Sequence, residues 1–290
     1  MTESAAYTLE APGAVLTYDV RRNDATTEPV LLMIGSPMGG AGFGTLSRHF
    51  ADRTVVTYDP RASERSRRTD GATETRVEEH ADDLHRLIEA LDAGAVDIFA
   101  SSGGAVNALA LVERHPEQVR TLIAHEPPAA SVLPDRDEVQ AAARDIHETY
   151  LRRGVGPGMA KFMALTSERG LIPPDYADRP DPDPVAFGLP TEDDGSRDDP
   201  LLGQNMISVT TYEFDFDALR AASTRIVVAH GAESMGEMAN RGATAVAERL
   251  GTTPAVFPSH HGGFLGGEYG WAGDPNAFAE KLREVLAGVA

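Results

Sequence analysis

The chain has 290 residues and a formal charge of −19, because 45 acidic side chains outnumber 26 basic ones. A surface this acidic is repelled by nucleic-acid phosphates and by anionic membranes, so we expect neither a nucleic-acid-binding nor a polybasic membrane-surface protein. Cysteine is absent, which excludes disulfides, thiolate metal sites and a cysteine nucleophile.

Apolar runs alternate with helix-like segments along most of the chain, which predicts an α/β protein with a mostly parallel, doubly wound sheet. Strands are expected at Val15–Val20, Val30–Ile34, Thr54–Tyr58, Ala95–Ala100, Thr121–His125, Arg225–His230 and Thr253–Phe257, the first of them as an edge strand. Helices are expected at Thr45–Phe50, 77–91, Gly103–Arg114, Arg136–Arg153, Gly158–Glu168, Gly242–Leu250 and Asn276–Val289.

Residues 127–212 break this alternation, and we expect them to form an inserted, mainly helical cap between two core segments, 1–126 and 213–290. Within the insertion, residues 173–200 are rich in Pro, Asp and Gly and lack periodicity, which is typical of a lid or a mobile loop. This segment holds nine acidic and two basic residues, a net charge of −7. If it overhangs a binding site, it should disfavour anionic substrates.

The N-terminus has neither the basic cluster nor the apolar stretch of a signal peptide. Two long uncharged stretches, 29–47 and 98–112, are too interrupted or too short to cross a bilayer. We therefore expect a cytoplasmic protein without a membrane partner.

The most informative motif lies between an expected strand and an expected helix, at Ala100-Ser101-Ser102-Gly103-Gly104. A strand that turns directly into a helix passes through a tight bend, and small residues two positions before and after its centre allow the backbones to approach. Ser102 occupies the centre, where its hydroxyl would project above the sheet at the positive end of the helix dipole. The pattern predicts a nucleophilic serine.

With this motif, the chain resembles the α/β-hydrolase fold family over about residues 12–126 and 213–290. The other matching segments are Ile34-Gly35-Ser36-Pro37, Tyr58-Asp59-Pro60-Arg61 and Phe257-Pro258-Ser259-His260-His261-Gly262-Gly263-Phe264. The resemblance implies that the backbone N–H groups of Ser36 and Gly103 form an oxyanion hole. It also implies that His261 is the general base, with His260 as the alternative.

The acid that orients this histidine has two candidate positions in the family. Glu126 follows the expected strand Thr121–His125, where a buried carboxylate needs a partner such as a histidine N–H. The commoner family position, three residues after Gly231, is occupied by Ser234, with Glu233 one residue earlier. We favour Glu126 and keep Glu233 as the alternative acid; Asp215 and Asp217 are further candidates.

A serine nucleophile implies acyl-enzyme chemistry, because relatives that act on halides or epoxides use a carboxylate instead. We expect hydrolysis of a carboxylic ester or lactone of a medium-sized, largely apolar small molecule, without a metal or cofactor. Candidate substrate-binding residues are Met38, Met163, Met206 and Tyr212. The alternative is a non-hydrolytic ligand-binding or cyclase-like protein on the same fold.

Overall fold

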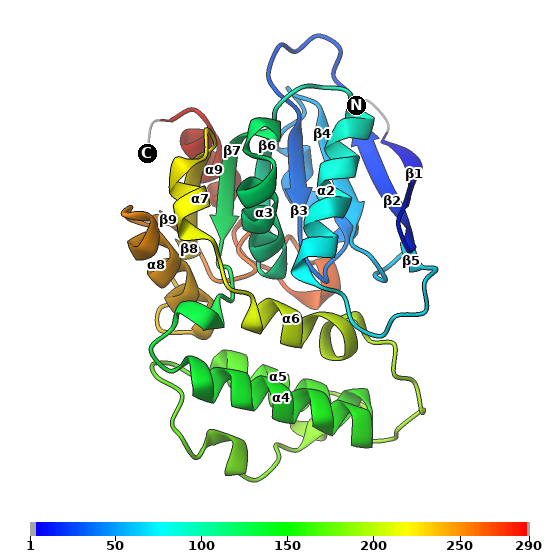
Figure 1. The fold of residues 1–290 in the computed structure, drawn as a ribbon, viewed down its shortest axis with the longest axis vertical. Helices are drawn as coiled ribbons and strands as arrows, with labels where there is room; N and C mark the ends of the chain where they lie inside the picture. The colour runs from blue at the N-terminus through cyan, green and yellow to red at the C-terminus, as the bar shows by residue number, and fades with distance from the viewer. Residues whose placement is uncertain (1–3, 289–290) are drawn as a thin grey trace.

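The computed structural model describes residues 4–288, which form a nine-stranded sheet with helices on both faces and a helical cap at one end (Figure 1). The strand order is β1-β2-β4-β3-β6-β7-β8-β9, and β5 pairs with β2. The pairs β1–β2, β2–β4 and β2–β5 are antiparallel, and all others are parallel. The carboxyl ends of the parallel strands face the cap, so side chains that follow these strands meet there (Figure 1).

The strands are β1 (Ala5–Ala11), β2 (Ala14–Arg21), β3 (Leu31–Ile34), β4 (Val55–Asp59), β5 (Arg67–Arg68), β6 (Val96–Ser101), β7 (Val119–His125), β8 (Arg225–Gly231) and β9 (Ala255–Phe257). The helices are α1 (Gly44–Arg48), α2 (Val77–Leu91), α3 (Gly103–Arg114), α4 (Arg136–Arg153), α5 (Val155–Ser167), α6 (Met206–Thr211), α7 (Phe216–Ala221), α8 (Met238–Leu250) and α9 (Pro275–Leu286). The C-terminal helix expected to reach Val289 ends at Leu286, and Val289 itself lies outside the described residues.

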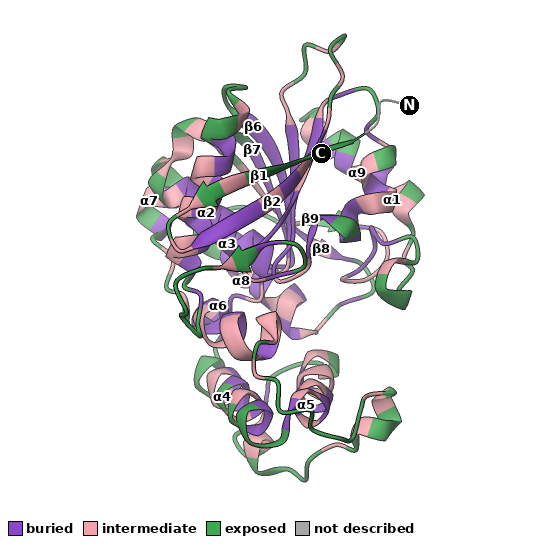
Figure 2. Ribbon diagram, turned by 90° about the vertical axis from the view of Figure 1, so that its right-hand side faces the viewer, coloured by how far each residue is buried: buried purple, intermediate pink, exposed green. Residues whose placement is uncertain are grey.

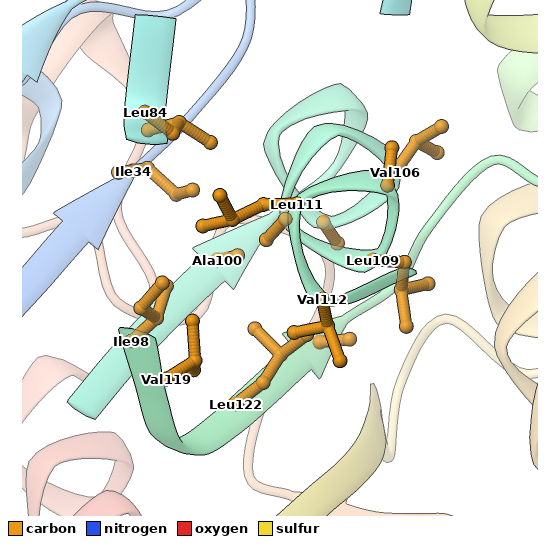
Figure 3. Close-up of a cluster of buried hydrophobic side chains, with 14 of the residues drawn as sticks. Ile34, Leu84, Ile98, Ala100, Val106, Leu109, Leu111, Val112, Val119 and Leu122 are labelled. Atoms are coloured by element: carbon orange, nitrogen blue, oxygen red, sulfur yellow. The ribbon is translucent and has the colours of Figure 1, made fainter. Parts of the chain in front are cut away.

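The continuous apolar runs form central strands because both faces of the sheet are covered. Successive side chains of a strand point to opposite faces. In β6, Ile98 and Ala100 accordingly pack with the cluster that includes α2 and α3, whereas Phe99 packs with α1 and α9 on the other face. Figure 3 shows the first cluster around α3. Helices α7 and α8 also belong to that first face (Figure 2).

Helix α3 is the most enclosed helix of the core, since every residue from 103 to 112 is buried. This burial fixes the position of its N-terminus at the carboxyl edge of the sheet. Among residues 4–288, no helix, α3 included, is both long and apolar enough to cross a membrane.

The edge of the sheet differs from expectation. The segment Val15–Val20 was expected at the edge, but β1 lies outside it and pairs with β2 from Ala5↔Val20 to Ala11↔Ala14. Strand β1 is mostly exposed and has no continuous apolar run, so hydrophobic periodicity gave no signal for it.

The cap lies between β7 and β8 in sequence and covers the carboxyl end of the sheet (Figure 1). Helices α4 and α5 form a hairpin through Gly154, whose φ of 84° suits glycine. A short π-helix, Pro200–Asn205, leads into α6, which lies between the sheet and the α4–α5 hairpin. The cap has its own apolar cluster, which includes Ile146, Tyr150 and Leu202.

The acidic segment 173–200 passes around the outer side of the α4–α5 hairpin and then turns back to the π-helix that leads into α6 (Figures 1 and 2). Two short 3-10 helices, Tyr176–Asp178 and Pro184–Phe187, interrupt it. Asp181 pairs with Lys161 of α5 at 2.7 Å and also with Arg153 of α4. The segment is thus fastened to both helices of the hairpin by ion pairs of Asp181.

His80 of α2 joins the core to the cap. Its ring is fully buried, and Nε2 lies 2.6 Å from Oδ1 of Asn205 in the π-helix. Burial lowers the pKa of His80 to about 4, although the hydrogen bond to Asn205 opposes that shift. Because the unfolded chain has a His pKa near 6.5, the unfolded state binds the proton more tightly between these values.

The contribution of His80 to stability is therefore complete above about pH 6.5 and is lost as the pH falls toward 4. We expect a loss of about 3 kcal/mol in the free energy of unfolding across this window from His80 alone. The variant His80→Gln, which does not titrate, should lose correspondingly less. Urea unfolding at about pH 7 and about pH 4.5 measures both changes. Equal losses in the two proteins would contradict the expectation.

Candidate active site

Ser102 lies at the turn between β6 and α3, at the centre of the carboxyl edge of the sheet. Its φ and ψ are 58° and −131°, a combination that non-glycine residues rarely adopt and that costs on the order of 1–3 kcal/mol. The Ser102 N–H donates to the His125 carbonyl of the neighbouring strand at 3.0 Å, which holds the turn in place. Such retained strain is typical of a functional turn.

The two glycines after Ser102 allow this turn to approach the turn after β3. A Cβ atom on Gly103 would lie 2.7 Å from the Ser36 carbonyl oxygen, and one on Gly104 would lie 2.8 Å from the Gly35 carbonyl carbon. The close approach brings together the backbone of Ser36 and that of Gly103. Among the described residues, neither of these N–H groups donates to a protein acceptor, so the pair can bind an oxyanion.

His261 lies in the loop after β9 and reaches the site from the adjacent part of the sheet edge. Its Nδ1 donates to Oε2 of Glu126 at 2.5 Å, which leaves Nε2 free to accept a proton. Within residues 4–288, Ser102 Oγ forms no hydrogen bond of its own.

Glu126 is fully buried at the end of β7. Its φ of 49° turns the chain out of the strand, and its N–H donates to the Ala229 carbonyl at 2.8 Å. The side chain is directed across the end of β8, where Oε1 accepts the Gly231 N–H at 2.8 Å and a hydrogen bond from Ser234 Oγ. Three donors therefore compensate the cost of burying this carboxylate.

The pair of Glu126 and His261 has mutually shifted pKa values. Burial alone would raise the pKa of Glu126, but the hydrogen bonds from His261 and Ser234 and the nearby imidazoles hold it well below its usual range. Burial alone would lower the pKa of His261, but the Glu126 carboxylate raises it above its usual value. The arrangement stabilises an imidazolium, as a general base requires.

The other candidate acids have different partners. Glu233 is exposed, and among the described residues its carboxylate makes no hydrogen bond with His261; its main-chain carbonyl accepts from Arg169. The Asp215 carboxylate caps α7 by accepting the N–H groups of residues 217 and 218. Asp217 forms a surface ion pair with Arg220.

His260, the alternative base, faces away from Glu126. Its Nε2 lies 3.3 Å from the Ala272 carbonyl oxygen, and its Nδ1 accepts the Gly262 N–H at 3.1 Å. With both ring nitrogens directed at the backbone, His260 shapes the loop that carries His261.

His125, beside Glu126 in sequence, lies beneath the site. Its fully buried ring packs against Phe99, Phe257 and Phe278, and the centroid of the His261 ring is 6.1 Å away. Burial lowers its pKa to about 4, which keeps the ring neutral near pH 7. His125 therefore adds no positive charge beside His261.

The four candidate substrate-binding residues are dispersed. Met38 is half-buried on the turn that carries Ser36, and Met163 is half-buried on α5. Met206 is buried in the apolar cluster of the cap.

Tyr212 donates its hydroxyl to Glu113 at 2.6 Å. Glu113 lies near the C-terminal end of α3, about 15 Å along the helix from Gly103. Tyr212 was predicted as part of the apolar lining of the substrate site, but this contact anchors the end of the cap to the far end of α3.

Ser234 is a site residue to which the sequence assigned no role. Its signal in the sequence is its position three residues after Gly231 at the end of a central strand, the position at which the family resemblance places an acid. Among residues 4–288, no three His, Asp or Glu side chains gather in a way that could hold a metal ion.

A family model described as alpha/beta hydrolase fold matches residues 28–153. Over 285 residues the chain is 31% identical to the uncharacterized hydrolase YraK of Bacillus subtilis (strain 168), covering 96% of this chain and 95% of the relative. Similar solved structures include a thermophilic esterase from Thermogutta terrifontis, with a TM-score of 0.67, 20% identity and 99% of each chain covered. An enol-lactonase from Burkholderia xenovorans LB400 has a TM-score of 0.65 and 13% identity, with 97% of this chain and 100% of that chain covered.

The strand order, the strained turn at Ser102 and the relation to YraK along nearly the whole chain agree with one another. The protein belongs to the α/β-hydrolase fold family.

Proposed function

We propose that the protein is a serine hydrolase that cleaves a carboxylic ester or lactone through an acyl-enzyme intermediate. The observation that carries this proposal is the hydrogen bond between Glu126 and His261, formed at the same sheet edge as the strained turn of Ser102. A buried carboxylate that orients a histidine, beside a projecting serine, is the arrangement that acyl transfer requires.

In the acylation step, His261 Nε2 takes the proton of the Ser102 hydroxyl while Oγ attacks the substrate carbonyl carbon. The carbonyl oxygen becomes an oxyanion, which the N–H groups of Ser36 and Gly103 stabilise. The protonated His261 then gives its proton to the leaving oxygen as the C–O bond breaks. Glu126 stays ionised throughout and stabilises the imidazolium.

In the deacylation step, His261 takes a proton from a water molecule that attacks the acyl carbon. Collapse of the second oxyanion breaks the bond to Ser102 Oγ, which recovers its proton from His261. An ester releases an alcohol in the first step, whereas the leaving hydroxyl of a lactone remains attached to the acyl chain. The cycle needs no metal or cofactor.

We propose a medium-sized, largely apolar substrate. Met38 supports this because it lies two residues from Ser36 and is half-buried. Met163 on the cap helix α5 is also half-buried and is a second candidate for apolar contact. Flexible, polarizable methionine side chains accommodate varied apolar groups.

The proposal is tested with a fluorophosphonate probe and a substrate panel. We expect the probe to label the native protein at Ser102, identified by peptide mass, and to leave heat-denatured protein unlabelled. A series of p-nitrophenyl esters of increasing acyl length, together with simple lactones, should show turnover that peaks at intermediate length. The absence of both labelling and turnover in folded protein would instead support the non-hydrolytic role.

A further inference from the structure

Ser234 lies at the start of the connection between β8 and α8, and its side chain is fully buried against Glu126. The single hydroxyl proton of Ser234 has two neighbouring acceptors, Glu126 Oε1 and the Gly231 carbonyl oxygen at 3.1 Å. An ionised carboxylate is the stronger acceptor, so the proton is donated to Glu126. Ser234 therefore binds the carboxylate oxygen that does not face His261.

The backbone around Ser234 is anchored independently of this hydrogen bond. The Glu237 N–H donates to the Ser234 carbonyl at 3.0 Å, where α8 begins. The Glu233 N–H donates to the Ser259 carbonyl at 2.9 Å, which ties this connection to the loop that carries His261. Ser234 thus offers its hydroxyl from a position that is fixed relative to both Glu126 and His261.

The two oxygens of Glu126 consequently have separate tasks. Oε1 is held by the Gly231 N–H and the Ser234 hydroxyl, and Oε2 is left for His261. Without Ser234, one backbone donor would remain on Oε1, and the carboxylate could rotate about its terminal torsion, which is broad for glutamate.

We propose that Ser234 is a positioning residue that fixes the rotation of the Glu126 carboxylate and thereby the orientation of His261. This inference rests on the proposed function, because it takes Glu126 and His261 as the acid and base of the hydrolase. Ser234 does not touch the reacting atoms and acts through Glu126.

The first test is Ser234→Ala, assayed by p-nitrophenyl butyrate hydrolysis across a range of pH. A hydrogen bond to a charged group corresponds to a factor of roughly 10–100, so kcat should fall by that factor with KM unchanged. The acid limb of the kcat/KM profile should also move to lower pH, because the bond to Glu126 is what raises the pKa of His261. A merely structural role would leave this limb in place.

Ser131→Ala is the matched control. Ser131 is also buried, but its hydroxyl donates to the Tyr212 carbonyl, away from the acid and base. This variant should keep both the rate and the pH profile of the parent protein. If Ser234→Ala does not fold, Ser234→Cys replaces it, because a thiol of similar size is only a weak donor. A wild-type rate or an unmoved acid limb in the folded variant would overturn the inference.

A double-mutant cycle separates this inference from the function on which it rests. In a Glu126→Ala background, Ser234→Ala should cause no further loss of kcat, because no carboxylate remains to be positioned. A further loss equal to that in the parent protein would overturn the inference. If Glu126→Ala alone kept the full rate, the proposed roles of Ser102, His261 and Glu126 as nucleophile, base and acid would be wrong. If Glu126→Ala were inactive while Ser234→Ala were fully active, only the proposed role of Ser234 would be wrong.

Discussion

Replacing Ser102 with alanine is expected to lower kcat for ester hydrolysis by about 10⁶-fold, because the covalent intermediate can no longer form. The residual rate would come from the oxyanion donors at Ser36 and Gly103 and from substrate binding. Fluorophosphonate labelling should disappear in the same variant. The measurement is initial-rate kinetics at high enzyme concentration, with the melting temperature recorded to show that the variant is folded.

Ser101→Ala provides the control for this variant, since the two serines are adjacent on the same turn. The Ser101 hydroxyl is buried and lies 3.2 Å from Nδ1 of His125, beneath the site. Ser102, in contrast, is only partly buried and holds the strained conformation of the turn. Labelling that persisted in Ser102→Ala but vanished in Ser101→Ala would show that Ser101, and not Ser102, is the nucleophile.

The sequence predicted the strands that are uninterrupted runs of apolar residues buried on both faces of the sheet. The runs Val30–Ile34 and Ala95–Ala100 became β3 and β6 because both of their faces are covered. Strand β1 was missed because it pairs on one side only and buries little. The π-helix Pro200–Asn205 was also missed, because it is held in place by contacts with residues far away in sequence, such as that of Asn205 with His80.

The same distinction applies to the site. Ser102 could be predicted because the elbow is a local pattern of small residues between a strand and a helix. The sequence favoured Glu126 for its place after an apolar strand and kept Glu233 as the alternative, because the choice is not a local one. It depends on the φ of 49° at Glu126, which directs the side chain across β8, and on Gly231 and Ser234 as donors more than 100 residues away in sequence. Met206 packs in the apolar cluster of the cap, because methionines pack a cap interior as readily as they line a site.

Glu126→Gln is expected to lower kcat by about 10⁴-fold. The amide keeps the size of the side chain but carries no charge, so it cannot stabilise the imidazolium that forms on His261 during acylation. It can also donate its N–H to Nδ1, which favours the tautomer with the ring proton on Nε2. In that tautomer Nε2 cannot accept the Ser102 proton. Initial rates and fluorophosphonate labelling rates should both fall, and the melting temperature shows whether the buried amide is tolerated.

Glu233→Gln is the matched control, because it makes the same chemical change at the alternative acid. Glu233 is exposed, and its carboxylate makes no hydrogen bond to His261 among residues 4–288. Its removal should therefore leave kcat essentially unchanged, since exposed charges contribute little through screened interactions. A large loss in Glu233→Gln with a small one in Glu126→Gln would mean that the loop after β8 rearranges during turnover to supply the acid. The buried pairing of Glu126 with His261 would then be a resting arrangement that the reaction abandons.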